Sequence, residues 1–140
     1  MGMMWNNAAF NRFQARFTNL DARILDQAEP LVEEALQEGA RVQQAVIATS
    51  GTGYKDRQGR VETGSMLDDV DTSPVRRSGS TVEGEFGWVD RRKDYYAYQE
   101  QGFTHYLSGK DVAPMHALFS GFATARETVR AGIRAILGRL

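Results

Sequence analysis

The sequence predicts an α+β fold in which a long, kinked N-terminal helix and a C-terminal helix pack on a small antiparallel β-sheet. Three observations predict this class. Apolar residues recur at helical spacing near both ends of the chain, a middle segment alternates apolar and polar residues, and glycine-rich stretches separate these segments. A chain of 140 residues fits one domain, 1–140, whose core needs neither a metal nor disulfides.

The N-terminal helical arm is predicted over residues 7–50. Its apolar positions advance by three or four residues, which places them on one face of a helix. They form two series: Phe10, Phe13, Phe17, Leu20 and Ile24, followed by Ala28, Val32, Ala35, Gly39, Val42 and Val46. The series meet beside Pro30, and proline removes a backbone hydrogen bond and clashes with the preceding turn. We therefore expect a kink or a break near Glu29.

The middle of the chain predicts a loop and a hairpin. Glycines among charged residues make 51–64 an exposed loop, followed by a sheet and aromatic segment over 65–103. Within it, Asp69–Arg77 and Thr81–Val89 read as two strands joined by a tight turn at residues 78–80.

Two details refine this hairpin. Pro74 cannot donate to a strand ladder, which indicates that the first strand lies at an edge. The second strand has one apolar face, formed by Val82, Gly84, Phe86 and Trp88.

The last segment predicts a loop over 103–113 and a C-terminal helix over 114–139. Pro114 suits the first helical position, where its missing N–H is not needed. The apolar face of this helix comprises Leu118, Phe122, Ala125, Val129, Ile133, Ile136 and Leu140.

Composition excludes several classes of site. The 17 basic and 18 acidic residues nearly balance, so there is no overall basicity of the kind that marks nucleic-acid-binding domains. Cysteine is absent, which excludes disulfides, thiolate zinc sites and cysteine nucleophiles. No stretch approaches the roughly 18 unbroken apolar residues that cross a bilayer, and no secretion signal is recognisable, so we expect a soluble protein made in the cytoplasm.

Chemistry-bearing motifs are sparse. His105, Asp111 and His116 supply a two-histidine, one-carboxylate set by residue type, but their spacing matches no metal motif. Residues 50–53, Ser-Gly-Thr-Gly, lack the pattern of a phosphate-binding loop and are read as a flexible loop. We expect no catalytic residue, no metal, no cofactor and no enzymatic activity.

Two charged patterns stand out. Arg126, Arg130 and Arg134 recur every four residues, so they share one face of the last helix. They form either a solvated face or an electrostatic contact with an acidic partner or with DNA. On the other helix an acidic cluster lies beside and just past Pro30 and consists of Glu29, Glu33, Glu34 and Glu38. Faces of opposite charge can pair between copies in a ring, although each exposed pair contributes less than about 1 kcal/mol.

An aromatic cluster spans residues 88–103 and consists of Trp88, Tyr95, Tyr96, Tyr98 and Phe103. Core packing accounts for two or three of these rings. Tyrosine and tryptophan are also enriched at protein interfaces, and base stacking is a third option, disfavoured by Asp94 and Glu100.

Three short motifs follow one another along the chain. Thr63-Gly64 precedes Met66-Leu67, then comes a Tyr-x-x-Tyr-x-Glu-x-Gly segment, then Pro114-Met115 leads into the last helix. The second motif comprises Tyr95, Tyr98, Glu100 and Gly102, and is followed by Phe103. In this order and spacing, over residues 20–137, the chain resembles the tail-completion, or minor tail and head–tail joining, proteins of long-tailed bacteriophages.

The resemblance implies a structural virion protein at the neck, acting as one subunit of a six-fold ring. Its partners would be further copies of itself and neighbouring tail-terminator, connector or stopper, and tail-tube proteins, with transient contact to passing DNA and none to a membrane. Gly64 and Gly102 would serve tight turns, Glu100 would accept backbone hydrogen bonds that fix its turn, and the tyrosines would pack or form interfaces. The alternative is a small nucleic-acid-binding or regulatory domain that uses the three arginines.

Overall fold

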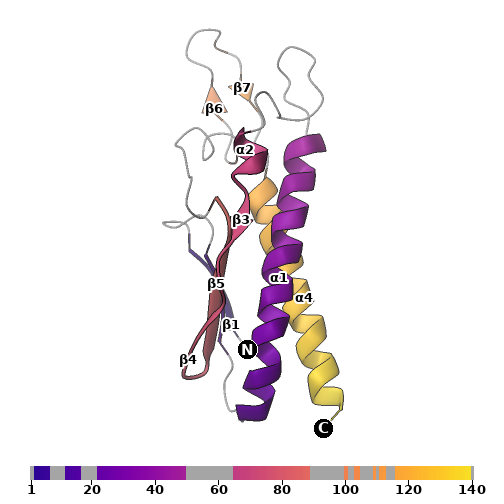
Figure 1. Ribbon diagram of the computed structural model, residues 1–140. Helices are drawn as coiled ribbons and strands as arrows, with labels where there is room; N and C mark the ends of the chain where they lie inside the picture. Colours follow the sequence, from indigo (N-terminus) through magenta and orange to yellow (C-terminus); the bar gives the residue numbers. More distant parts are fainter. Residues whose placement is uncertain are drawn as a thin grey trace.

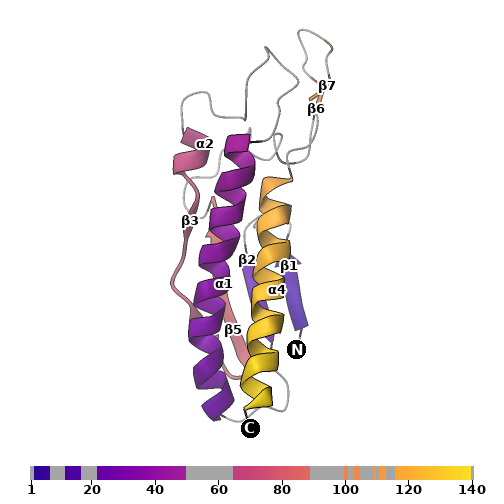
Figure 2. The same ribbon diagram turned by 90° about the vertical axis from the view of Figure 1, so that its right-hand side faces the viewer.

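The computed structural model describes residues 2–6, 12–16, 22–49, 65–88, 100, 103–104, 109, 111–112 and 116–139. Helices α1 (Ala22–Thr49) and α4 (Ala117–Gly138) stand side by side against one face of an antiparallel sheet (Figures 1 and 2). The α+β class predicted from the sequence is confirmed.

Helix α1 passes through Pro30 without a break. The side chain of Pro30 is exposed, while apolar residues before and after it are buried: Ile24, Leu25, Ala28, Val32, Ala35 and Leu36. Burial of this continuous face on both sides of the proline outweighs the one backbone hydrogen bond that proline removes.

The prediction of helix over residues 7–50 is wrong at its beginning. Strands β1 (Gly2–Asn6) and β2 (Arg12–Arg16) pair there as antiparallel neighbours. In β2 the side chains of Phe13 and Ala15, two residues apart and thus on the same face of a strand, are fully buried. Phe13 lies opposite Gly84 of the next strand, and its ring meets Phe122 of α4 at a centroid distance of 5.7 Å. Long-range packing therefore overrides the helical spacing of the phenylalanines.

The centre of the sheet is β5 (Thr81–Gly87), which pairs with β2 on one side. On its other side it pairs with two short segments, β3 (Asp71–Thr72) and β4 (Arg76–Ser78). The predicted hairpin and its edge position are confirmed, but the first strand is divided in two. A short helix, α2 (Ser65–Asp68), precedes it where the predicted sheet segment begins.

Ser73 bridges the interruption that Pro74 causes between β3 and β4. Its N–H donates to the carbonyl oxygen of Glu85 at 2.8 Å, and its Oγ accepts from the N–H of Glu85 at 2.8 Å. A side-chain oxygen thus replaces one rung of the ladder, which keeps the edge segment attached to β5.

The tight turn between β4 and β5 consists of Gly79 and Ser80, and Gly79 has a φ of 59°. Two-residue hairpin loops need positive φ at the first position, which glycine adopts without cost. We expect Gly79→Val to lower the free energy of unfolding by about 1–2 kcal/mol, and Gly79→Asn to cost less, because asparagine tolerates this conformation. Urea denaturation of both variants tests this, and equal costs would contradict it.

Two further boundaries differ from the prediction. Residues 103–113, predicted as a loop, contain the paired strands β6 (Phe103–Thr104) and β7 (Asp111–Val112). Helix α4 begins at Ala117, three residues later than predicted, because His116 has a φ of 55° and cannot belong to a right-handed helix. The predicted apolar face of α4 is buried at Leu118, Ala125, Val129, Ile133 and Ile136.

Candidate functional site

Glu100 caps the N-terminus of α4 from a distance in sequence. The N-cap residue of α4, His116, makes no side-chain capping bond. Instead Oε1 of Glu100 accepts from the N–H of Leu118 at 2.8 Å, and Oε2 accepts from the N–H of Phe119 at 3.1 Å. The carbonyl oxygen of Glu100 also accepts from the N–H of His116 at 3.3 Å. The side-chain carboxylate and the backbone carbonyl of Glu100 therefore both hold the beginning of α4.

This carboxyl group is buried, with 5% of Glu100 exposed. Burial raises the pKa of Glu100 above its ordinary value, while the backbone donors of α4 and the nearby His116 act in the opposite direction. The helix N-terminus, which otherwise attracts anions, is occupied by the protein's own carboxyl group. Glu100 accepts backbone hydrogen bonds as expected, but the donors lie 18 and 19 residues further along the chain and hold the start of α4, so the expected role in its own turn stays a prediction.

The other motif residues divide into two groups. Trp88 is buried at the end of β5 and belongs to the core, and Phe103 lies in β6. The remaining predicted motif residues fall outside the described part of the chain: Thr63, Gly64, Tyr95, Tyr98 and Gly102.

Of the three potential metal ligands predicted from the sequence, only His116 has a side chain that the structure describes. His116 is exposed at the start of α4, where its ring meets that of Phe119 at a centroid distance of 6.3 Å. Asp111 lies in β7, and His105 is outside the described residues. Across the described residues, no cluster of three or more potential ligands is found. Nor does any helix among them have the length and apolar content to span a membrane.

The surface that we call the arginine face consists of Arg126, Arg130 and Arg134 on α4. Arg126 and Arg134 are exposed, and Arg130 is half-buried with its Nη1 at 3.3 Å from Oε1 of Glu127. Phe119 and Leu137, with exposures of 60% and 42%, lie beyond its two ends along the helix. The face thus combines long cationic side chains with exposed apolar groups.

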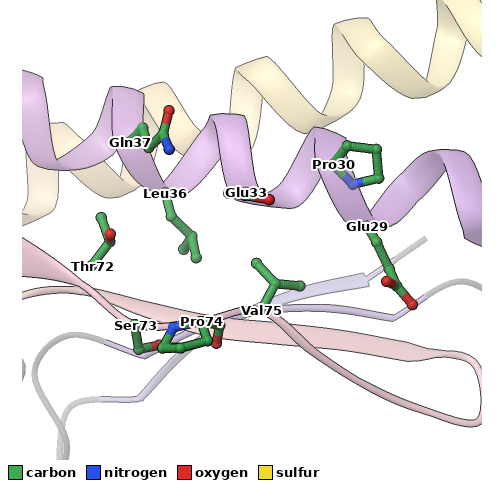
Figure 3. A pocket seen from close by; sticks show the side chains of 9 residues that line it. All are labelled: Glu29, Pro30, Glu33, Leu36, Gln37, Thr72, Ser73, Pro74 and Val75. Atoms are coloured by element: carbon green, nitrogen blue, oxygen red, sulfur yellow. The ribbon is translucent and has the colours of Figure 1, made fainter.

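A groove of about 590 Å³ runs between α1 and the chain around Pro74 (Figure 3). Leu36 of α1 and Val75 point toward each other across it, and Glu29 lies at one end. We call Asp26, Glu29 and Glu33, which lie along this side of α1, the acidic edge. Of the predicted acidic cluster, Glu29 and Glu33 line the groove, whereas Glu38 pairs with Arg41, whose Nη2 lies 2.8 Å from Oε2 of Glu38.

Arg77 of β4 binds two members of the acidic edge. Its Nη1 lies 2.6 Å from Oδ1 of Asp26 and 3.4 Å from Oε1 of Glu29. Because the side chains of Asp26 and Glu29 remain 70% and 44% exposed, the pairs fix the position of β4 against α1 more than they stabilise the fold. The sequence drew attention to the glutamates, but gave no sign that Arg77, some 50 residues away, would join them.

Gln43 of α1 is a buried polar residue that was not predicted from the spacing of apolar residues in the sequence. It is 0% exposed, and within the described structure neither its Oε1 nor its Nε2 has a hydrogen-bond partner. The signal was a glutamine four residues after Gly39, on the buried side of the helix.

We expect Gln43→Leu to raise the free energy of unfolding by about 1–2 kcal/mol, because it replaces unsatisfied polar atoms by an apolar side chain of similar size. Thermal and urea denaturation test this, with the exposed Gln37→Leu as the control that should change little. A loss of stability in Gln43→Leu alone would contradict it.

Comparisons of the chain with protein-family models, with curated proteins and with solved structures find no significant match.

Proposed function

We propose that this chain is a non-enzymatic structural protein of a long-tailed bacteriophage, a tail-completion or head–tail joining subunit that forms a ring at the neck. The observation that carries the proposal is the ordered set of three motifs. The structural role of Glu100 supports the proposal, because this motif glutamate holds the C-terminal helix through backbone hydrogen bonds. Its role is structural, as expected for a motif in an assembly protein.

The proposed partners are further copies of the chain and the tail-terminator, connector or stopper, and tail-tube proteins of the same virion. The arginine face, with its exposed apolar ends, supports a role in contact with other macromolecules. In this proposal DNA passes the ring only transiently.

Phage particles assembled without this chain test the proposal. We expect separate filled heads and tails, which join when the purified protein is added, and a ring of added density at the neck by electron cryomicroscopy. Normal joining in its absence, or failure of the added protein to restore joining, would contradict the proposal.

A second candidate function is nucleic-acid binding through the arginine face, favoured by the exposure of Arg126 and Arg134. It requires binding that weakens steeply with salt, because each phosphate contact releases counterions. Fluorescence anisotropy with duplex DNA, at several salt concentrations, measures this slope. Replacing the three arginines with alanine reduces the slope if this function is correct, and leaves DNA retention unchanged if it is not.

A further inference from the structure

We propose that the acidic edge of one copy receives the arginine face of the next copy, so that identical subunits join side by side, head to tail. This inference rests on the proposed function, because it supplies the interface between neighbouring subunits of the ring. Four features of the structure support it: the placement, height, charge and shape of the two surfaces.

The two surfaces lie at opposite sides of the molecule. Phe122 of α4 faces Phe13 of β2, whereas its neighbour Gly121 faces Gly39 of α1. Counted from Gly121 at about 100° per residue, the three arginines lie about 140° to 180° around α4, so the arginine face is directed away from α1. The acidic edge borders the groove between α1 and the β3–β4 segment. It therefore lies on the side of α1 that is away from α4. Figure 2 shows β3 flanking α1 and β1 flanking α4.

Because α1 and α4 lie side by side, the positions of charged residues on both helices can be compared along their common axis. Two contacts show that they run antiparallel: Gly39 meets Gly121, with only 3.0 Å between a Cβ built on Gly39 and the carbonyl oxygen of Gly121, and Leu31 meets Gly132. Moving one residue forward on α4 therefore corresponds to one residue backward on α1, about 1.5 Å along the axis.

Measured on this scale, the two charged surfaces coincide in height. Counting from the Gly39–Gly121 contact, the arginine face stands level with residues 34, 30 and 26 of α1, and counting from the Leu31–Gly132 contact it stands level with residues 37, 33 and 29. The acidic edge carries its carboxylates at residues 33, 29 and 26. On either count, a neighbour that is shifted sideways without a change of height thus presents at least two of the three arginines to within one residue of a carboxylate.

The charges are matched in number as well as in position. Three carboxylates with Arg77 leave the acidic edge with a net charge of two negative units. Three arginines with Glu127 leave the arginine face with two positive units. Potentials of opposite sign steer the encounter and fix the register of the two copies.

The groove has the composition that an arginine side chain requires. Its glutamates offer carboxylates for a guanidinium group, and Leu36, Pro74 and Val75 provide apolar surface for the methylene stem. A volume of about 590 Å³ leaves room for such a side chain to enter. Apolar burial in the groove adds strength that exposed ion pairs alone do not supply.

This contact is heterologous, since different surfaces of identical chains meet. Because both surfaces lie at the same height, every subunit keeps the same orientation along the helices. Repetition around an axis parallel to α1 and α4 gives a ring in which no subunit is inverted when the rotation per subunit divides a full turn.

Cross-linking between introduced thiols tests the interface directly, since the chain contains no cysteine. Glu33→Cys and Arg126→Cys are made as separate exposed variants, mixed in equal amounts at high concentration and treated with a short bis-maleimide. We expect the mixture to give several-fold more covalent dimer than either variant alone, and less as salt is added. In the control mixture Glu34→Cys replaces Glu33→Cys and moves the thiol about 100° around α1. Equal yields in the test and control mixtures would overturn the proposed interface.

Charge exchange gives an independent readout. One variant combines Arg130→Glu with Arg134→Glu, and the other combines Glu29→Arg with Glu33→Arg. Light scattering is expected to show weakened self-association of each variant and restored association of the mixture. In the mixture, the acidic surfaces of the first variant meet the basic surfaces of the second. Failure of the mixture to associate better than its components would refute the pairing.

These outcomes separate the interface from the proposed function. If the wild-type protein joins heads to tails but the thiol and charge variants show no pairing, the interface is wrong and the function stands. If the pairing holds but the protein does not restore joining, the interface stands and the function is wrong.

Discussion

Glu100→Ala is expected to lower the free energy of unfolding by about 3 kcal/mol. Two hydrogen bonds from backbone N–H groups to a carboxylate disappear together, and hydrogen bonds to charged groups contribute about 1.5–3 kcal/mol each. The N–H groups of Leu118 and Phe119 lose their partner at a helix N-terminus that His116 does not cap. Urea denaturation at pH 7 measures the change, and a loss below about 1 kcal/mol would show that solvent replaces the carboxylate without difficulty.

Glu100→Gln separates the hydrogen bonds from the charge. Its amide oxygen still accepts one backbone hydrogen bond, so we expect a smaller loss of about 1 kcal/mol. Burial raises the folded-state pKa of Glu100 above its ordinary value of 4.5. The protonated form is therefore favoured in the folded state, and this contribution to stability is fully present below the unfolded-state pKa and is lost as the pH rises through the folded-state pKa.

The pH dependence follows from this sign. We expect the stability of the wild type, relative to Glu100→Gln, to fall as the pH rises from 4.5 through the raised pKa and then to become constant. Taking the difference between the two proteins cancels the titration of the other carboxylates. A difference that grows in favour of the wild type with rising pH would show that the helix donors outweigh the cost of burial.

Gly121→Ala is expected to lower the free energy of unfolding by about 2 kcal/mol, the second largest effect. A Cβ at Gly121 would lie 2.8 Å from Cε2 of Phe86 and closer still to the carbonyl oxygen of Gly39. The carbonyl belongs to the backbone of α1, so the two helices must move apart. Overpacking costs about 1–3 kcal/mol, and here it exceeds the roughly 1 kcal/mol that alanine gains over glycine within a helix.

Gly138→Ala is the matched control, because a Cβ at Gly138 of the same helix meets nothing within 4 Å. We expect it to be neutral or slightly stabilising in the same thermal and urea denaturation. If Gly121→Ala behaves like this control, the close approach of α1 and α4 is not a constraint on the fold.

The parts of the fold with local signals could be predicted from the sequence. The apolar face of α4 and the alternation in β5 depend on neighbouring residues, and both predictions are confirmed. The strand at Phe13 was not predicted, because Phe10, Phe13 and Phe17 match a helical period and their competitor, pairing with β5, involves residues about 70 positions away. Sequence spacing carries no information on such long-range pairing.

The candidate site shows the same division. The acidic cluster and the arginine face are visible as spacings along single helices. The height match between them depends on where Gly39 meets Gly121, and the cap on α4 depends on the placement of Glu100 beside Leu118. Both are properties of tertiary packing, so the sequence identified the residues without revealing their relationship.

Pro30 has one more consequence for the acidic edge. Lacking an N–H, it cannot donate to the carbonyl oxygen of Asp26, four residues earlier in α1. That backbone oxygen is left without its intrahelical donor beside the exposed Asp26 side chain, which adds partial negative charge to this edge. A guanidinium group carries five N–H donors, enough to bind a carboxylate and a backbone carbonyl together. The residue that weakens the helix thus equips the acidic edge with an acceptor that protonation does not neutralise.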